Sequence, residues 1–419
     1  MARALSPSVN PPSRTSLMTR IASILVLSVA CAAPSCAQEK LVVQEKVALQ
    51  QKRTFTFEQA GVRFSNQFSG ARLNECTQVG SSAFRLVIRP ENTPINDSAW
   101  YAFQVTAETP RTITASLTYV GGRHRYKPRI SRDGRVWSPL EADRWVYDRE
   151  KGTVALRLDV DKRPLWVAGR DLVGVAQIES WADALARKPF IRQSTIGKSM
   201  RGHPIRMMEL GNSESRNLVF VISRQHPPEV TGTFGLMAFV SKLCEDTPLS
   251  KSFRDRFLTL IVPLVNPDGV DAGHWRHNMG GVDLNRDWKD FKQPETRQVR
   301  DALLKIAARP RARPFLFLDF HSTNRDVFYT QKDEHPTFPE NFTRDWLAAL
   351  AKRFPDYRVR RSGAHDPTTG TSKGWFYERF KIPSITYEFG DHTDREPIRR
   401  VTGGSTEEIM KLLLAAARN

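Results

Sequence analysis

Cysteine is scarce in this chain, with 4 residues among 419. Cys31 and Cys36 lie in an apolar stretch near the N-terminus, which leaves Cys76 and Cys244 far apart in the rest of the chain. A disulfide framework and a closed structural zinc site both need cysteines in pairs or clusters. We therefore expect no disulfide framework, and we predict that Cys76 and Cys244 are buried as small hydrophobic residues.

Long apolar runs are also lacking, and the most apolar stretch is residues 18–37, "MTRIASILVLSVACAAPSCA". Its basic residue, short apolar core and small residues are typical of a secretory signal peptide, and the core is short for a membrane span. We predict that residues 1–37 are a leader with a signal peptide and that no stable membrane span remains after its removal. The protein is then expected in the periplasm or outside the cell. Lipid attachment at Cys31 or Cys36 stays open.

Acidic residues are outnumbered, because 63 Lys and Arg stand against 45 Asp and Glu and give a net charge of +18. Such a balance favours anionic partners, among them acidic peptides and nucleic acids. The basic residues are scattered through both halves of the chain, however, and no dense basic run alternates with aromatic residues. We expect no nucleic-acid partner. The sequence leaves the oligomeric state open.

Residues 45–170 alternate short β-rich segments with turn residues. The segments are "RTFTFEQ", "FRLVIRP", "WYAFQVTAE", "RTITASLTYVGG", "TVALRLDV" and "LWVAG". Short strands separated by Gly, Pro, Asn and Asp indicate an all-β sandwich, with Trp100, Trp137 and Trp145 as packing residues. No catalytic cluster is visible in this part of the chain.

Residues 175–419 alternate strand-like and helix-like segments. Strands are expected at 191–200, 203–213, 217–223, 257–265, 314–322 and 384–390, and helices at 175–188, 295–308, 342–354, 371–380 and 405–417. Continuous apolar strands such as "LFLDF" indicate a sheet that is buried on both faces. We therefore predict an α/β fold with a mixed central β-sheet flanked by helices, preceded by the all-β sandwich, with the boundary near 165–180.

Polar side chains stand where several of these strands end. His226 and Glu229 follow the strand at 217–223, His321 lies at the end of 314–322, and Glu388 lies at or near the end of 384–390. Ligands in open α/β sheets bind beyond the carboxyl ends of the strands. His226, Glu229 and His321 can converge there, and two nitrogens with one carboxylate leave a fourth position open, as in catalytic zinc sites.

The segment 266–288, "NPDGVDAGHWRHNMGGVDLNRDW", carries three donors among turn-forming residues, namely Arg276, Asn285 and Arg286. An Asn-Arg pair can hold a carboxylate, and a separate Arg near a metal can stabilise an oxyanion. The alternative is that both arginines are solvated surface charges and that Asn285 belongs to a turn.

These motifs together resemble the zinc metallocarboxypeptidases, the carboxypeptidase A-like peptidases. The resemblance rests on "HPPE" at 226–229, "NPDG" at 266–269, Arg276, "DLNRDW" at 283–288, "DFH" at 319–321 and "TYEFG" at 386–390, and it extends over residues 190–415. The preceding segments "NTPINDSAWYAFQV", "HRYKPRISRDGRVW" and "LWVAG" resemble the N-terminal sandwich of the cytosolic carboxypeptidase branch and its bacterial relatives.

The resemblance implies a role for each matching residue. His226, Glu229 and His321 would bind one Zn²⁺ per chain, and Glu388 would be the general base that takes a proton from the attacking water. Arg276 would steady the oxyanion. Asn285 and Arg286 would hold the terminal carboxylate of a peptide or protein substrate, which makes the enzyme an exopeptidase.

Two positions bear on the details of the site. The family supplies a tyrosine from a loop ahead of the catalytic glutamate, whereas "RRSGAHDPTTGTSKG" contains none; His365 or another group then takes that place, or the pocket is built differently. Lys373 stands near the position that lines the pocket for the terminal side chain in the family. A buried lysine there would favour a terminal Glu or Asp, and the alternative is a solvated Lys373 at a helix start.

Our hypothesis is a zinc-dependent metallocarboxypeptidase that releases a C-terminal residue, preferably Glu or Asp. Two alternatives stay open. The same metal centre could serve a zinc amidohydrolase acting on cell-wall peptides or N-acyl amino acids, and the scaffold could belong to a non-catalytic binding protein.

Overall fold

The computed structural model describes residues 46–418 of the chain. Residues 46–418 all belong to one compact unit. The expected leader 1–37, with Cys31 and Cys36, lies outside the described residues, so the signal peptide stays a prediction. The expected boundary near 165–180 also stays a prediction, although the strands change from two small sheets to one large sheet between Ala168 and Ile191.

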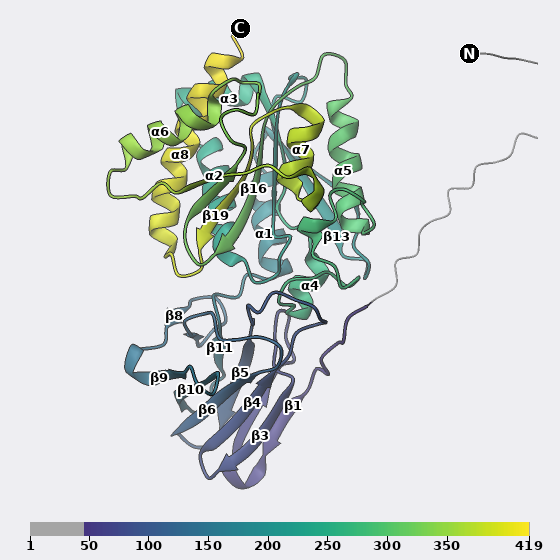
Figure 1. Cartoon of the computed structure of the whole chain (residues 1–419). Coiled ribbons are helices and arrows are strands. Elements are labelled where there is room, and N and C mark those ends of the chain that lie inside the picture. Colours follow the sequence, from purple (N-terminus) through teal and green to yellow (C-terminus); the bar gives the residue numbers. More distant parts are fainter. Residues whose placement is uncertain (1–45, 419) are drawn as a thin grey trace, which may run out of the picture. The chain divides into compact units, whose positions relative to one another are not determined.

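The β-rich part of the chain forms two sheets (Figure 1). The first has the order β1 (Thr54–Phe57), β2 (Val62–Ser65), β5 (Ala102–Ala107), β11 (Leu165–Ala168), β7 (Arg129–Ser131), β8 (Ser138–Pro139). The second has the order β3 (Glu75–Gly80), β4 (Ala83–Ile88), β6 (Arg111–Tyr119), β10 (Thr153–Val160), β9 (Trp145–Asp148). The single-turn 3₁₀ helices are η1 (Glu58–Ala60) and η2 (Ala142–Arg144).

The two small sheets share one apolar core, because inward-facing residues alternate with solvent-facing ones along their strands. Phe64 and Phe103 from the first sheet and Phe84 from the second are all fully buried in it. Trp100 and Trp137 are buried there as expected, and Trp145 packs at its margin. One member of this core, Trp275, comes from a loop more than a hundred residues further along the chain.

The remaining strands form an eight-stranded mixed sheet. Its order is β12 (Ile191–Lys198), β13 (Pro204–Gly211), β15 (Phe257–Val262), β14 (Asn217–Ser223), β16 (Arg313–Thr323), β19 (Ser384–Gly390), β17 (Val327–Thr330), β18 (Arg361–Gly363). Strands β15, β14, β16 and β19 run parallel, whereas β13 and β17 pair antiparallel with the two outer members of that group. The prediction of a mixed central sheet is confirmed.

Helices cover both faces of this sheet (Figure 1). They are α1 (Val175–Ala186), α2 (Val230–Leu243), α3 (Pro248–Arg256), α4 (Pro267–Ala272), α5 (Pro294–Ala307), α6 (Phe342–Arg353), α7 (Ser372–Phe380) and α8 (Arg395–Ala416), with single 3₁₀ turns at η3 (Leu284–Arg286) and η4 (Pro367–Thr369). Residues of α2, α6 and α8 pack on one face, and those of α5 and α7 pack on the other.

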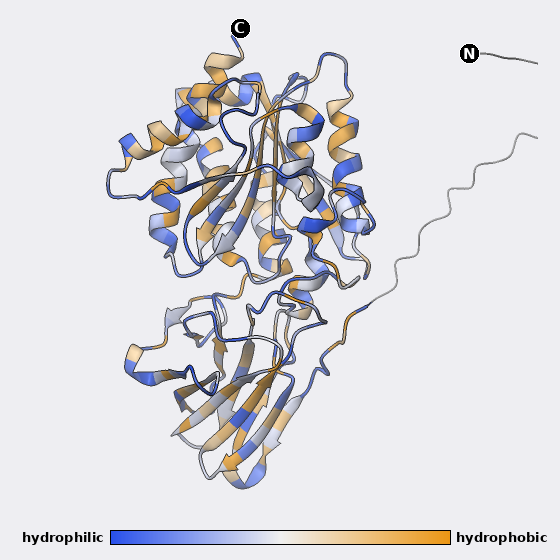
Figure 2. Ribbon diagram, in the orientation of Figure 1, coloured by the Kyte–Doolittle hydropathy of each residue, from blue (hydrophilic) through white to orange (hydrophobic). Residues whose placement is uncertain are grey.

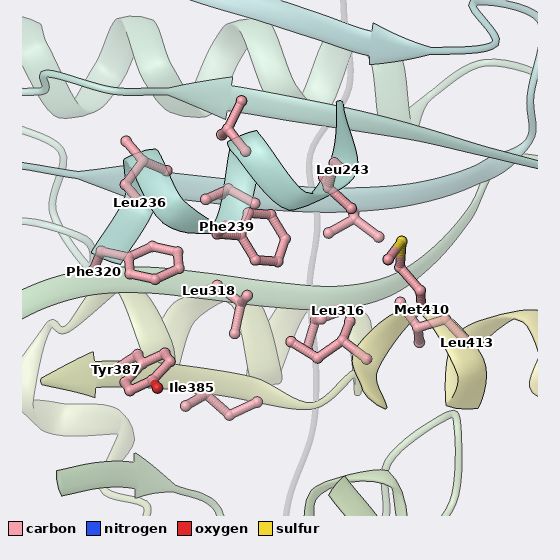
Figure 3. Packing of buried hydrophobic residues seen from close by; sticks show 14 of the residues in the cluster. Leu236, Phe239, Leu243, Leu316, Leu318, Phe320, Ile385, Tyr387, Met410 and Leu413 are labelled. Atoms are coloured by element: carbon pink, nitrogen blue, oxygen red, sulfur yellow. The ribbon is translucent and has the colours of Figure 1, made fainter. Parts of the chain in front are cut away.

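Successive residues of the central strands point to opposite faces and enter different cores. Val219 and Val221 of β14 join the core beneath α2 and α8, whereas Phe220 joins the core beneath α5 and α7. Figure 3 shows the first of these cores, where Phe239 of α2 lies near Leu318 of β16. Continuous burial explains the uninterrupted apolar strands, which Figure 2 shows as orange ribbon at the centre of the sheet. It makes the sheet a rigid support for the loops at its carboxyl edge.

The sequence located β14 and β19 at their observed bounds, but the last helix was placed wrongly. It was expected at 405–417, whereas α8 begins at Arg395. Two adjacent glycines lower the helix propensity of this stretch. In the structure a Cβ at Gly404 would meet the ring of Phe354 at 2.5 Å, so the glycine permits close packing of α8 against the end of α6.

The two cysteines that the structure describes are unpaired. Cys76 is buried in the core between the two small sheets, and Cys244 is partly buried at the end of α2. Among residues 46–418 we find no helix with both the length and the apolar character that a bilayer crossing requires.

Candidate metal centre and active site

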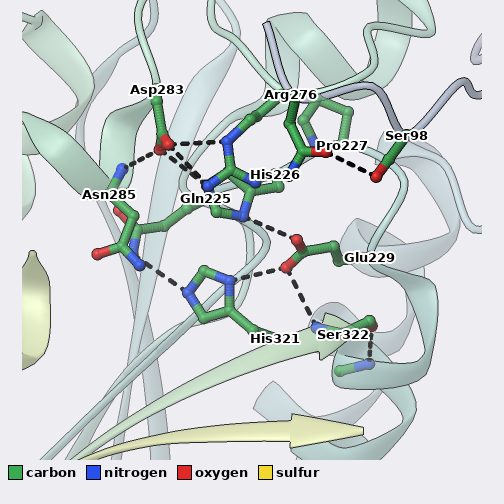
Figure 4. Close-up of polar contacts among 12 residues, drawn as sticks. Ser98, Gln225, His226, Pro227, Glu229, Arg276, Asp283, Asn285, His321 and Ser322 are labelled. Carbon is green, nitrogen blue, oxygen red and sulfur yellow. Dashed lines mark hydrogen bonds and ion pairs between the residues drawn. The ribbon is translucent and has the colours of Figure 1, made fainter. Parts of the chain in front are cut away.

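Three predicted ligands converge at the carboxyl edge of the large sheet. His226 and Glu229 lie in the turn between β14 and α2, where the left-handed backbone of Arg224 (φ 61°) follows the end of the strand, and His321 lies on β16. Glu229 Oε1 is 2.9 Å from His226 Nδ1, and its Oε2 is 2.7 Å from His321 Nδ1. The candidate ligand atoms all lie within 4.8 Å of one another. Figure 4 shows the two imidazoles turned toward the same carboxylate.

The Nε2 atom of each imidazole, which faces away from Glu229, contacts a separate carboxylate. Asp283 Oδ1 is 2.8 Å from His226 Nε2, and Asp319 Oδ2 is 2.9 Å from His321 Nε2. Metal-binding histidines typically donate their other N–H to a carboxylate, which fixes the tautomer and turns the free nitrogen toward the metal. The donor set therefore fits zinc, with two imidazole nitrogens, one carboxylate and room for a further ligand.

The charges in this cluster depend on one another. Burial acts to raise the pKa of Glu229, but the adjacent His226 and His321 hold it well below its usual range. Burial acts to lower the pKa of His321, but Asp319 and Glu229 hold it well above its usual range. The carboxylates thus carry enough negative charge to attract a cation to this point.

Glu388 lies on β19 directly beside His321, its partner in the parallel register. Its Oε2 atom is buried and has no hydrogen-bond partner among the described residues. Burial and the neighbouring charge of Glu229 raise the pKa of Glu388 to about 8. A dication held by the three ligands would act in the opposite direction, so the carboxyl group is in an environment that can both take up and release a proton.

The predicted anion-binding residues lie beside the metal centre. Both Nε and Nη2 of Arg276 contact Oδ2 of Asp283, each at 2.7 Å, so the carboxylate behind His226 also orients this arginine. Asn285 uses its Oδ1 atom to accept from the backbone N–H of Ser372 at 2.9 Å, which leaves its amide nitrogen as the donor. Arg286 donates to the carbonyl of Asn285 at 2.8 Å.

These groups share one cavity of about 390 Å³. It is lined by every predicted site residue, namely His226, Glu229, Arg276, Asn285, Arg286, His321, Lys373 and Glu388. Five segments of the chain, from His226 to Glu388, therefore meet at one edge of the sheet, and three of them contribute the residue from a strand or a helix rather than from a loop.

Lys373 is the second residue of α7 and is partly buried in this cavity wall. Its Nζ donates to the carbonyls of Ala364 at 2.5 Å and Thr330 at 3.3 Å. Burial lowers the pKa of Lys373 to about 8. No carboxylate of the described residues forms an ion pair with it, so it is a partly buried cation without a counter-charge among these residues.

A tyrosine missed by the sequence analysis lines the same cavity. Tyr329 of β17 lies opposite Thr386 of β19, and burial together with the charge of Glu388 raises its pKa. His365 also lines the cavity, but its Nε2 contacts Glu378 at 2.5 Å. Tyr377 is buried, and its ring packs edge-to-face with the ring of His365 at a centroid distance of 4.7 Å. The only sequence signal for Tyr329 was its place in the short β-rich segment "VFYT" after His321.

The β-rich part of the chain also reaches the cavity, through Asn96 and Arg125. Arg125 Nε is 2.7 Å from Asp391 Oδ2, and its Nη1 donates to Ser98 Oγ at 2.5 Å. No catalytic cluster was predicted in this part of the chain, and nothing in the local sequence around Asn96 and Arg125 marks them as residues of the site.

Comparison with known proteins identifies a family for most of the α/β part of the chain. The family model described as zinc carboxypeptidase matches residues 178–402. An uncharacterized protein of Zymomonas mobilis is 24% identical over 82% of this chain and 92% of its own length. Cytosolic carboxypeptidase 6 of Mus musculus is 22% identical over 62% of this chain and 53% of its own length, so the match spans about half of that relative.

Solved structures agree in fold. A metallo-carboxypeptidase from Burkholderia cenocepacia has a TM-score of 0.70 and 20% identity, and the match covers 84% of this chain and 99% of the other. At this identity the likeness shows that the fold is shared. A match over 84% of the chain is longer than residues 178–402, so it includes part of the β-rich region.

Proposed function

The chain belongs to the zinc carboxypeptidase family, and on this premise we propose that it removes the C-terminal residue of peptides and favours an acidic one. It is a zinc metallopeptidase. One observation carries the proposal of C-terminal release with an acidic preference. A single cavity is lined by the three metal ligands, by Glu388, by the donors Arg276, Asn285 and Arg286, and by the unpaired cation of Lys373.

His226, Glu229 and His321 would hold the zinc ion, and Asp283 and Asp319 would keep the two imidazoles in the required tautomer. When bound, zinc supplies Lewis acidity, which polarises the scissile carbonyl and makes water a better nucleophile at neutral pH.

Glu388 would act as general base and then as general acid. It takes one proton from the attacking water while the water oxygen bonds to the peptide carbonyl carbon, and it delivers that proton to the departing nitrogen as the C–N bond breaks. The products are a shortened peptide carboxylate and a free amino acid. Arg276 would donate to the oxygen that becomes negative during the attack.

Asn285 and Arg286 would hold the terminal carboxylate of the substrate. Asn285 has a free amide donor because Ser372 occupies its oxygen, and Arg286 has a planar group suited to two parallel hydrogen bonds. A site that grips a carboxylate beside the scissile bond accepts chain ends and rejects internal bonds, which makes the enzyme an exopeptidase.

Lys373 would select the terminal side chain. A partly buried ammonium group without a carboxylate partner loses hydration that its two carbonyl contacts replace only in part. A terminal Glu or Asp would supply the missing counter-charge, whereas a neutral side chain would leave it unpaired.

The experiment that tests this proposal is mass spectrometry of a panel of peptides that differ only in the terminal residue, with and without a chelator. Wild type, Glu388→Gln and Lys373→Ala are compared, together with C-terminally amidated peptides, a muropeptide and an N-acyl amino acid. We expect chelator-sensitive release of terminal Glu and Asp, none from amidated peptides, and loss of the acidic preference in Lys373→Ala. Preferred cleavage of the muropeptide or the acyl amino acid would replace the proposal with an amidohydrolase.

We also propose that the protein is exported, on the basis of the signal-like pattern of residues 18–37. Cell fractionation followed by mass spectrometry of the mature N-terminus tests this: a mature chain that begins between residues 31 and 45 in the exported fraction is expected, and an intact leader in the cytoplasm would overturn it.

A further inference from the structure

We propose that Glu91, in the β-rich part of the chain, is a positioning residue that holds the loop 274–278 so that Arg276 faces the reacting carbonyl. The inference rests on the proposed role of Arg276 in the hydrolysis. It gives the β-rich part an indirect function in catalysis, because the residue that positions the oxyanion donor comes from outside the segment that carries all eight predicted site residues.

The carboxylate of Glu91 accepts hydrogen bonds from three consecutive backbone N–H groups. Trp275 donates to Oε2 at 2.8 Å, and Arg276 and His277 donate to Oε1 at 2.9 and 2.7 Å. The partners are 184 to 186 positions apart in the chain. Three consecutive N–H groups that donate to one carboxylate fix the backbone of the loop, because a displacement of the loop would break three charge-assisted hydrogen bonds in a buried environment.

The Glu91 carboxylate is fully buried and charged. Its side chain has no exposed surface, and burial acts to raise its pKa, but His274, Arg72 and the loop N–H groups hold the pKa below its usual value. A buried anion of this kind strongly prefers the loop conformation that solvates it, since any other conformation would leave it without its hydrogen bonds.

Two further contacts hold the loop 274–278 against the β-rich part of the chain. The indole of Trp275 is buried in the apolar core between the two small sheets. Asn92, the neighbour of Glu91, contacts His277 Nδ1 through its Oδ1 atom at 2.7 Å and donates from Nδ2 to the carbonyl of Gly281 at 2.9 Å. Arg276 thus stands between two anchored residues, Trp275 and His277, and its guanidinium contacts Asp283 in the wall of the cavity.

This arrangement has a specific consequence for catalysis. A donor for a developing oxyanion works when it is already in place, and small displacements are costly because the charge appears only in the transition state. Loss of the Glu91 contacts should therefore weaken binding of the transition state more than binding of the substrate. The terminal carboxylate of the substrate is held by Asn285 and Arg286, which Glu91 does not contact.

The test uses Glu91→Gln in the full-length zinc enzyme. The amide keeps the size of the side chain but replaces one acceptor oxygen by a donor. We expect kcat to fall by about 10- to 100-fold, which does not exceed the loss caused by removing an oxyanion donor altogether. KM should stay within about twofold of the wild-type value. Affinity for a tetrahedral phosphonate peptide analogue should fall with kcat, whereas affinity for the product amino acid should not change.

A double-substitution cycle separates positioning from a general loss of stability. In an Arg276→Ala background, Glu91→Gln should cause little further loss of kcat, because the group that it positions is gone. The matched control is Asp171→Asn, which removes another buried carboxylate; Asp171 pairs with Arg129 and Arg395 and forms no hydrogen bond or ion pair with the described residues 274–278. It should lower the melting temperature and leave kcat and phosphonate affinity unchanged.

Three results would overturn the inference: an unchanged kcat in Glu91→Gln, equal losses of affinity for the phosphonate and the product, or fully additive losses in the double variant. If Glu91→Gln does not fold, Glu91→Asp keeps the charge and shortens the reach. In the wild-type protein, amide hydrogen exchange at residues 275–277 must be slow; fast exchange there would also refute the proposal.

Discussion

His321 and Glu388 lie opposite each other on the neighbouring parallel strands β16 and β19. The register of two central strands therefore sets the spacing between a metal ligand and the proposed general base, and neither depends on a mobile loop. A one-residue slip of either strand would turn one of the two side chains to the opposite face of the sheet. Continuous packing of both strands on α2 and α8 prevents such a slip.

Glu388→Gln is expected to lower kcat by about 10²- to 10⁴-fold, because the amide cannot accept the proton of the attacking water. Zinc content should stay at one ion per chain, since Glu388 is not among the ligands. The measurement is peptide hydrolysis together with metal analysis of the same preparation. Full activity in this variant would assign the base to another residue.

Asp283→Asn is expected to weaken zinc binding by about 10- to 100-fold, because the carboxylate that fixes the tautomer of His226 becomes an amide. Competition with a chelator measures the affinity. Asp290→Asn is the matched control on the same segment, since Asp290 is exposed and pairs with Lys292. Equal affinities in the two variants would contradict the role given to Asp283.

Gly232→Ala is expected to destabilise the protein by about 1–3 kcal/mol and to weaken zinc binding. A Cβ at Gly232 would meet the carbonyl oxygen of His321 at 2.6 Å, so α2 and β16 must separate at the ligand itself. Gly403→Ala in α8 is the control, because its Cβ would meet only the flexible end of Lys242, at 3.3 Å, and alanine favours the helix. Denaturant unfolding with and without zinc measures both effects.

The preference for an acidic terminal residue should fall as the pH rises through about 8, the value to which burial lowers the pKa of Lys373. The substrate carboxylates stay ionised throughout, while the ammonium group loses its proton. The ratio of kcat/KM for a terminal Glu to that for a terminal Gln should therefore drop by about tenfold between pH 7 and pH 9.

Lys373→Met should give a low ratio that does not change with pH. Lys381→Met, which removes an exposed lysine at the end of the same helix, should keep the wild-type profile. A falling ratio in Lys373→Met would show that another group titrates.

Much of the site could be predicted from the sequence because its residues stand at the ends of buried parallel strands. His226, His321 and Glu388 each follow an apolar segment, and the carboxyl ends of parallel strands meet at one edge of a sheet whatever the loops between them do. The turn "HPPE" adds its own local signal, since two adjacent prolines are incompatible with a central strand and indicate a turn, in which Glu229 contacts His226.

Asp283 and Asp319 were within the quoted motifs "DLNRDW" and "DFH", but their role as partners of the two imidazoles depends on which atoms face each other in space. Tyr329 was hidden because β17 pairs antiparallel with β19, a pairing that a four-residue segment does not reveal.

By itself, the sequence determined the sheet-and-helix pattern and the chemical identity of the residues at its carboxyl edge, because both follow from local periodicity and from where apolar strands end. Only the tertiary structure decided that Glu91 and Arg125 belong beside that edge. They reach it through contacts across more than 180 positions in the chain, and such contacts are set by the packing of the whole unit rather than by any local pattern.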